Sequence, residues 1–235
     1  MVDIHCHLLP GVDDGPKSWE ETLQMCETAV ADGITHIVAT PHCNDFWSYD
    51  REALQAQLDE LASRFPALGF TLGCDFHFSY ESVQDFKLCP HHYTIGTTQY
   101  LLVELSDFGI PQALSSVFFE MISSGTIPII THPERNPIIQ KRLNLLEEWS
   151  SLGCLVQMTA NSLTGRWGPN VKKISEKLVR QGLVSVIASD AHNVGSRPPI
   201  LSEARKVVAK LVGDQGAASL FFDVPDAIVR GERLL

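Results

Sequence analysis

Short apolar runs rich in β-branched residues recur along the chain, and each predicts a buried strand. Several are almost continuously apolar, as in Ile127-Pro128-Ile129-Ile130, which is typical of parallel strands covered on both faces. The runs span residues 2–7, 35–40, 70–76, 100–105, 127–132, 154–159 and 183–189.

Helical patterns fall between these runs. The first begins at Ser18, which has capping-box spacing to Glu21, and ends at Gly33. Others are predicted over residues 52–65, 111–125, 143–153, 170–182 and 202–212, whereas residues 81–88 give a less clear pattern. Strands that alternate with helices predict an α/β fold, either a parallel (β/α) barrel or a doubly wound sheet. Because no repeat or linker-like stretch interrupts the pattern, we expect a single domain over residues 1–235.

Composition narrows the class of protein. The chain is 44% hydrophobic with a formal net charge of -10, which favours a full core and argues against binding nucleic acid. It lacks an apolar run of about 18 residues, the length of a membrane span, and the basic and apolar start of a signal peptide. The six cysteines are scattered, as is typical of reduced thiols. We therefore expect a cytoplasmic protein that does not insert into membranes.

Most of the predicted strands end in a His, Asp or Glu side chain. Because the carboxyl ends of parallel strands meet at one edge of a barrel, we expect these side chains to lie together. Residues two apart in an extended segment share a face, so His5 converges with His7, and Asp190 with His192. Imidazole and carboxylate ligands suit Mn, Fe or Zn, and the set is too large for one ion, which predicts a cluster of two or three. The set comprises His5, His7, His42, Asp75, Glu104, His132, Asp190 and His192.

Other residues near these strand ends have candidate roles. Spacing alone leaves open whether Asp13 or Asp14 faces the site. Arg135 and Arg197 follow His132 and His192 in loops beyond the same edge, where a guanidinium is a good ligand for phosphate oxygens.

Three further groups carry less specific signals. Residues 44–49 and Trp167 either line a substrate mouth or pack against neighbouring helices. Gln157 and Asn161 are candidates for hydrogen bonds to metal ligands. The remaining histidines show no partner pattern and are expected to be structural or exposed; they are His36, His91 and His92.

Blocks of this sequence resemble the polymerase-and-histidinol-phosphatase (PHP) metallohydrolase family, and within it the bacterial capsule- and exopolysaccharide-associated protein tyrosine phosphatases. The blocks are residues 3–7 (DIHCH), 12–16 (VDDGP), 132–135 (HPER), 188–193 (ASDAHN) and 197–199 (RPP). The resemblance spans nearly the whole chain. It implies a distorted (β/α)7 barrel of the PHP type, with three metal ions at the C-terminal ends of the strands. Manganese is the preferred ion, with iron or zinc as alternatives.

The resemblance also implies a ligand set. The first metal would take His5, His7 and Asp190, the second Glu104 and His132, and the third Asp14, His42 and His192, with Asp75 shared by the first two. Asp75 stands where the family usually has glutamate, so a shift of strand or metal must make up for one methylene. His77, two residues on, is a further candidate ligand.

The implied reaction is hydrolysis of a phosphate monoester. Metals lower the pKa of a bound water from about 15.7 towards 7, and the resulting hydroxide would attack phosphorus in line. Arg135 and Arg197 would hold the phosphate, and His42 or His192 is a candidate to protonate the leaving oxygen. The implied substrate is phosphotyrosine on an autophosphorylating bacterial tyrosine kinase of capsule or exopolysaccharide biosynthesis.

Alternatives differ in substrate, class or mechanism. Histidinol phosphate, or another small phosphate ester, would be hydrolysed by the same chemistry. A non-catalytic accessory subunit would retain the fold with degenerate metal residues, but the ligand set here is nearly complete. A cysteine-based tyrosine phosphatase places Arg six residues after Cys, whereas Arg51 follows Cys43 by eight without intervening glycines, which excludes that mechanism.

Overall fold

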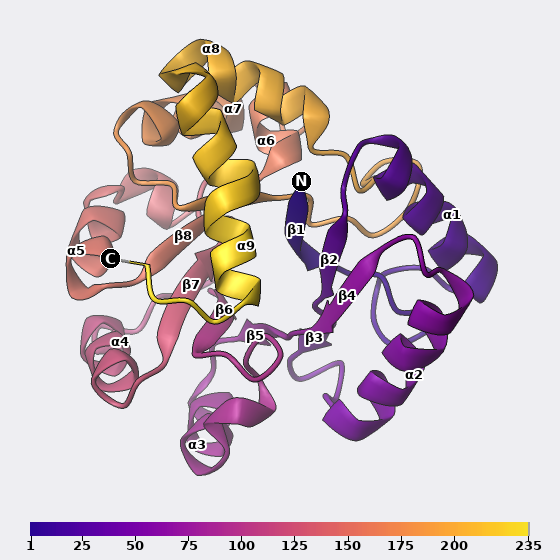
Figure 1. The fold of residues 1–235 in the computed structure, drawn as a ribbon. Coiled ribbons are helices and arrows are strands. Elements are labelled where there is room, and N and C mark those ends of the chain that lie inside the picture. Colours follow the sequence, from indigo (N-terminus) through magenta and orange to yellow (C-terminus); the bar gives the residue numbers. More distant parts are fainter. Residues whose placement is uncertain (235) are drawn as a thin grey trace.

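Parallel strands form the centre of the fold in the computed structural model, which describes residues 1–234 (Figure 1). Within these residues one sheet has the strand order β1-β2-β4 and the other the order β3-β5-β6-β7-β8-β9. The alternation of parallel strands with helices is confirmed. The strands are β1 (Val2–Cys6), β2 (His36–Ala39), β3 (His42–Cys43), β4 (Gly69–Leu72), β5 (Asp75–His77), β6 (Tyr100–Glu104), β7 (Ile127–Thr131), β8 (Leu155–Thr159) and β9 (Val186–Ala188).

The closed seven-stranded barrel is not confirmed, because the strands lie in two sheets. The continuous strand predicted over residues 70–76 is wrong: β4 ends at Leu72 in one sheet, and β5 begins at Asp75 in the other. Gly73 lies at this break, where a Cβ atom would stand 2.9 Å from Val38 Cγ1. The close approach of the chain to its neighbour therefore requires glycine where the strand changes sheets.

The two sheets also meet at β1. A single parallel bridge joins Cys6 to Ala191, just beyond β9, and the His7 amide donates a hydrogen bond of 2.8 Å to the Ala191 carbonyl. One bridge is less than a ladder, but it sets the end of β1 beside the end of β9.

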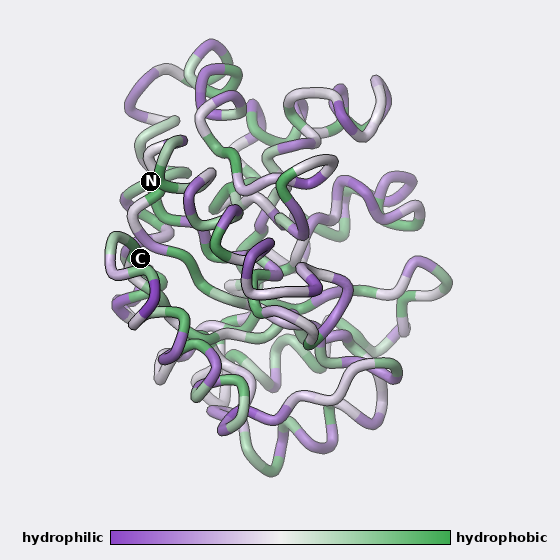
Figure 2. The backbone as a smooth tube through the Cα atoms, turned by 90° about the vertical axis from the view of Figure 1, so that its right-hand side faces the viewer, coloured by the Kyte–Doolittle hydropathy of each residue, from purple (hydrophilic) through white to green (hydrophobic). Residues whose placement is uncertain are grey.

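Alternate side chains of the central strands pack in two different cores. In β6, Tyr100 and Leu102 belong to an inner core, whereas Leu101 and Val103 pack in an outer core that includes side chains of the surrounding helices. Burial on both faces explains the continuous apolar runs. The hydropathy-coloured backbone shows apolar segments along the central strands (Figure 2). Glu104 continues the inner series of β6 at its carboxyl end.

Helices connect the strands as the patterns predicted, with additions. The unclear segment becomes a helix capped by Ser79, and the helix predicted over residues 202–212 continues through a kink at Gly213. No helix within residues 1–234 has both the length and the apolar character needed to cross a membrane. The α-helices are α1 (Trp19–Ala31), α2 (Arg51–Arg64), α3 (Tyr80–Leu88), α4 (Leu114–Ser123), α5 (Asn144–Leu152), α6 (Ala160–Thr164), α7 (Pro169–Arg180), α8 (Ser202–Ala218) and α9 (Val224–Val229).

The last helix covers the starting end of the inner core. Ile228 of α9 is fully buried in the inner core that also contains Val2 and Tyr100. The Tyr100 hydroxyl donates a hydrogen bond of 2.6 Å to the Glu232 carbonyl. The helix α9 lies beside β1 (Figure 1). Because it covers one end of the strands, a site can form only at their opposite, carboxyl ends.

Candidate metal centre

A bulge in β1 turns two histidines toward the inner side of the strands. The pairing of β1 with β2 shifts register between Asp3 and Cys6. Ile4 packs in the inner core and Cys6 in the outer core, so the bulge changes which residues face inward. The side chains of His5 and His7 then converge, with 3.2 Å between their Nε2 atoms, as the period-two spacing predicted.

The other predicted ligands surround this pair. Ligand atoms within 4.8 Å of one another form three groupings, which are His5 with His7 and Asp75; His42 with Asp75 and Glu104; and His7 with Asp14, His42 and His192. The two remaining residues contact members of these groupings. Asp190 Oδ1 lies 3.6 Å from His5 Nε2, and His132 Nε2 lies 3.7 Å from Glu104 Oε1.

The Nδ1 atom of each β1 histidine lies within hydrogen-bond distance of an oxygen atom. His5 Nδ1 lies 3.0 Å from Gln157 Oε1, and His7 Nδ1 lies 2.7 Å from Asp13 Oδ2. Because both partners are acceptors, each Nδ1 carries the proton and each Nε2 presents a lone pair in the neutral imidazole. Two lone pairs 3.2 Å apart repel each other, so the space between them favours a positive charge, which is either a proton on one ring or a metal ion. The donor set therefore fits a bound metal.

Unsatisfied polar atoms support the same fit. Both carboxylate oxygens of Asp75, together with His42 Nδ1 and His192 Nε2, are buried and make no hydrogen bond of good geometry within residues 1–234, although His42 Nδ1 lies 3.2 Å from Asp75 and His192 Nε2 lies 3.1 Å from Asp14. Buried polar atoms are normally hydrogen-bonded, so a concentration of unpaired ones among histidines and acids requires an explanation. A divalent cation supplies it.

The buried carboxylates of the site favour positive charge, and they raise the pKa of two of its histidines. Burial lowers the pKa of His5, but the carboxylates of Asp75 and Asp190 outweigh it and raise that pKa to about 9. The pKa of His42 also reaches about 9, because Asp75 outweighs burial there. Burial and the neighbouring His192 lower the pKa of His7 to about 4. Without metal, the centre thus holds protons at neutral pH where metal ions would bind.

Two of the candidate ligands occupy unusual backbone conformations. His132 has φ 34° and Asp190 has φ 53°, and these are the non-glycine residues with positive φ within residues 1–234. Such conformations cost of order 1–3 kcal/mol and concentrate at functional sites. The backbone turns of the loops after β7 and β9 therefore aim these side chains back over the strand ends.

Spacing left open which aspartate of the Gly11–Gly15 turn faces the site. In the structure both do, and each contacts different histidines. Asp13 is 5% exposed and accepts hydrogen bonds from His7 Nδ1, the Gly15 amide (2.9 Å) and the His42 amide (3.1 Å). Asp14 Oδ1 lies 3.1 Å from His192 Nε2 and 3.5 Å from His42 Nε2. Asp13 thus orients ligands, whereas Asp14 stands among them.

Two buried acids were missed by the sequence reasoning. Asp3 accepts hydrogen bonds from the Ser189 amide (2.9 Å) and hydroxyl (2.5 Å), so it ties β1 to the loop that carries Asp190. Glu134 accepts from the Thr159 amide (3.0 Å) and the Ser162 hydroxyl (2.6 Å), and both carboxylates are fully buried. Their signal in the sequence was position alone, since each lies two residues from a predicted ligand.

Both predicted phosphate-binding arginines reach the centre. Asp190 Oδ2 lies 2.8 Å from Arg135 Nη2 and 2.7 Å from Arg197 Nη2. The guanidinium carbons stand 4.6 Å and 5.8 Å from the centroid of the Trp167 ring, close enough for a cation–π contact at Arg135 in particular. The buried Arg135 Nε makes no hydrogen bond within residues 1–234, so this fork retains donors for an anion.

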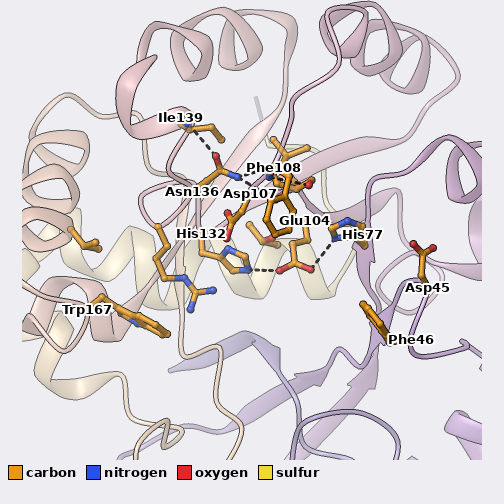
Figure 3. A pocket seen from close by; sticks show the side chains of 15 residues that line it. Asp45, Phe46, His77, Glu104, Asp107, Phe108, His132, Asn136, Ile139 and Trp167 are labelled. Atoms are coloured by element: carbon orange, nitrogen blue, oxygen red, sulfur yellow. Dashed lines mark hydrogen bonds and ion pairs between the residues drawn. The ribbon is translucent and has the colours of Figure 1, made fainter.

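A cavity of about 640 Å³ opens beside the centre (Figure 3). Glu104 and His132 lie on its floor, and His77 Nδ1 lies 3.4 Å from Glu104 Oε2. The cavity is lined by Asp45, Phe46, His77, Glu104, Leu105, Ser106, Asp107, Phe108, Thr131, His132, Arg135, Asn136, Ile139, Trp167 and Val171. Of the two predicted mouth segments, Trp167 and part of residues 44–49 therefore line it, and the Phe108 loop was missed.

Other predicted residues take structural places. His36 Nε2 lies 2.8 Å from Thr71 Oγ1, and His92 Nε2 lies 3.4 Å from the Tyr49 carbonyl oxygen, while His91 is exposed. Arg51 donates hydrogen bonds to the backbone carbonyls of residues 92, 94 and 96. It anchors a loop, in agreement with the exclusion of a Cys43–Arg51 phosphate cradle.

Comparisons with known proteins identify the family to which the chain belongs. The family described as "Capsular polysaccharide synthesis, CpsB/CapC" matches residues 1–230. A putative tyrosine-protein phosphatase, CapC of Staphylococcus aureus, is 39% identical over 208 residues, which cover 86% of this chain and 81% of CapC. The tyrosine-protein phosphatase YwqE of Bacillus subtilis is 34% identical over 220 residues, covering 92% and 86%.

A solved structure is similar over the whole length. It comes from a study of YwqE from Bacillus subtilis and CpsB from Streptococcus pneumoniae, described as unique metal-dependent tyrosine phosphatases. It covers 100% of this chain and 96% of its own, with a TM-score of 0.94 and 32% identity. The chain is therefore a member of the CpsB/CapC family of capsular polysaccharide synthesis proteins.

Proposed function

We propose that this chain is a metal-dependent protein tyrosine phosphatase. The observation that carries the proposal is the pair of His5 and His7 Nε2 atoms, 3.2 Å apart and each with its other ring nitrogen already bonded to an acceptor. This arrangement favours a cation among the surrounding carboxylates. The similarity to a putative tyrosine-protein phosphatase of Staphylococcus aureus and to a tyrosine-protein phosphatase of Bacillus subtilis supports the reaction class.

The proposed centre holds three divalent ions, with manganese as the preferred metal. Its ligands are His5, His7, Asp14, His42, Asp75, Glu104, His132, Asp190 and His192. When bound, such metals supply a hydroxide nucleophile at neutral pH and neutralise phosphate charge. Asp75, shorter than the glutamate usual in the family, lies 3.6 Å from His5 Nε2 and 3.2 Å from His42 Nδ1, so its strand already stands close to both neighbours.

Arg135 and Arg197 would bind the phosphate. Both guanidinium groups lie at the wall of the centre, and Trp167 and Asp190 restrict their movement. A pre-oriented fork loses little freedom when it binds a phosphate bidentately, and it stabilises charge that spreads over the equatorial oxygens. His42 and His192 are the imidazoles proposed to hold a proton near the leaving oxygen, although a phenolate requires little protonation.

The proposed substrate is phosphotyrosine on an autophosphorylating bacterial tyrosine kinase of capsule or exopolysaccharide biosynthesis. The family description, which places its members in capsular polysaccharide synthesis, supports this setting. We further propose that the two sheets form a distorted (β/α)7 barrel, because the breaks at residues 40–41 and 73–74 leave hydrogen bonds running from strand to strand.

The test is hydrolysis of p-nitrophenyl phosphate, a phosphotyrosine peptide and histidinol phosphate, before and after chelation. We expect EDTA to abolish hydrolysis of the two aryl phosphates, Mn²⁺ to restore it, and Cys43→Ser to retain activity. Activity in protein shown by elemental analysis to be free of metal would refute the metal-dependent mechanism. A large preference for histidinol phosphate would refute the substrate class.

A further inference from the structure

Exposed aromatic side chains surround the mouth of the cavity beside the metal centre. Phe46, after β3, is 86% exposed, Phe108, after β6, is 99% exposed, and Trp167, after α6, is 41% exposed. Figure 3 shows Trp167 on one side of the cavity and Phe46 on the other, with Glu104 and His132 between them. Apolar side chains gathered at the rim of a polar cavity are typical of a binding surface.

Local contacts hold these rings in place. Asn44 Oδ1 accepts hydrogen bonds from the Phe46 amide (2.9 Å) and the Trp47 amide (3.2 Å). The Phe46 ring meets Trp47 edge-on at 6.1 Å, and Trp47 stacks on His42 at 5.3 Å with an interplanar angle of 15°. Through Trp47, the Phe46 ring is therefore connected to His42, a candidate metal ligand.

The backbone of Phe108 and the ring of Trp167 are also restrained. The Phe108 amide donates a hydrogen bond of 3.2 Å to Ser106 Oγ, which closes a tight turn at the loop tip. Trp167 lies 4.6 Å from the Arg135 guanidinium, which in turn pairs with Asp190. Trp167 is thus positioned in advance, and the Phe46 and Phe108 rings extend from backbone turns that are already fixed, so little backbone entropy is lost when they contact a ligand.

Charge at the mouth restricts what these rings can bind. Asp45 and Asp107, each immediately before one of the phenylalanines, are exposed and line the cavity. The arginines lie deeper, beside Asp190. A ligand that places a phosphate on the arginines therefore meets carboxylates at the rim, which repel acidic groups on either side of the phosphorylated residue.

We propose that Phe46 and Phe108 clamp the polypeptide on both sides of the phosphotyrosine, while Trp167 contacts its phenyl ring. The occupant is an extended segment with apolar, non-acidic residues next to the phosphotyrosine. This inference rests on the proposed phosphatase function and adds its specificity for protein substrates. Because Phe46 and Phe108 are 86% and 99% exposed at the rim, we expect their contribution to depend on the residues that flank the phosphotyrosine.

The test compares kcat/KM for a phosphotyrosine peptide flanked by leucine with kcat/KM for p-nitrophenyl phosphate. In the double variant Phe46→Ala/Phe108→Ala, loss of two apolar contacts should lower the ratio of peptide to p-nitrophenyl phosphate at least about tenfold, mainly through KM. Phe119→Ala is the matched control, because this 59% exposed phenylalanine of α4 is not among the cavity-lining residues. It should leave the ratio unchanged. The wild-type protein should hydrolyse the leucine-flanked peptide faster than a glutamate-flanked one.

Each other outcome has a definite meaning. An unchanged ratio in the double variant, an equal fall for both substrates, or preference for the glutamate-flanked peptide would overturn the clamp while leaving the phosphatase function intact. If the metal-loaded wild-type protein hydrolyses neither aryl phosphate, the proposed function fails and the clamp fails with it. Circular dichroism of the variants checks that the fold is retained.

Discussion

Substitution of Asp13 tests how the proposed metal centre is held together. Asp13 accepts hydrogen bonds from two proposed metal ligands, His7 and His42, but is not itself a proposed ligand. Its carboxylate accepts hydrogen bonds from the His7 ring and from the amides of Gly15 and His42. Asp13→Ala removes all three acceptors and frees the His7 ring to rotate or to change tautomer. Asp13→Asn retains an oxygen for His7 but removes the charge.

The expected magnitude follows from these contacts. Loss of a residue that orients a metal ligand costs about 10–100-fold in metal affinity, or roughly 1.4–2.7 kcal/mol. With three hydrogen bonds lost, Asp13→Ala should weaken Mn²⁺ binding about 100-fold, and Asp13→Asn about tenfold, by the same rule. Since the proposed ligands themselves remain, excess Mn²⁺ should restore most of the activity.

The assay is a titration of metal-free protein with Mn²⁺, followed by calorimetry and by hydrolysis of p-nitrophenyl phosphate. Asp214→Ala, at an exposed position of α8, serves as the control for loss of one negative charge. Thermal unfolding of the metal-free variants confirms that they fold. If Asp13→Ala binds Mn²⁺ as tightly as the wild-type protein, Asp13 does not orient the metal ligands.

Further predictions concern protons, packing and the backbone. Because the pKa values of His5 and His42 are raised to about 9, metal-free protein at pH 7.5 should release roughly two protons per chain when it binds Mn²⁺. For the same reason, its apparent affinity for Mn²⁺ should rise with pH up to about 9. A pH indicator in unbuffered solution measures the release of protons. Glu134→Ala should lower the free energy of unfolding in urea by about 2–4 kcal/mol, because two buried donors lose their acceptor, whereas Glu134→Gln should cost less. Gly73→Ala should cost about 1–3 kcal/mol in the same assay, because its Cβ atom would meet Val38 at 2.9 Å.

These predictions have clear contrary results. Metal binding that releases no protons would mean that the histidines are already neutral in the metal-free protein. A Glu134→Ala protein with the urea midpoint of the wild-type protein would show that the buried donors find other acceptors. A Gly73→Ala protein of wild-type stability would mean that the chain yields easily where it changes sheets.

Sequence patterns predicted the parts of this protein that depend on local periodicity. The His5/His7 pair follows from alternation along a strand, and the order of strands and helices follows from buried apolar runs. Alternation alone did not reveal that β1 contains a bulge, which is what places both the Ile4 and His5 side chains on the inner side. That depends on pairing with β2, a contact between distant segments.

The division of the strands into two sheets does not follow from local periodicity. The run over residues 70–76 has an apolar residue at every second position, as a single half-buried strand would, so nothing in its period indicates that it belongs to two sheets. The break appears in the structure, where β4 ends at Leu72 and β5 begins at Asp75 in the other sheet. The Phe108 ring was missed for a different reason, because a single exposed aromatic residue in a loop has no periodicity to detect.

The link between Asp3 and Ser189 has a consequence for how the protein comes to hold metal. Its two partners are separated by 186 positions, and the ligand-bearing segments next to them are equally distant along the chain. A contact of such long sequence separation forms late and slowly in folding. During synthesis, His5 and His7 can therefore meet Asp75 well before they meet Asp190 and His192. We expect the grouping of His7, Asp14, His42 and His192 to be completed last, so the proposed three-metal centre should assemble in steps rather than at once.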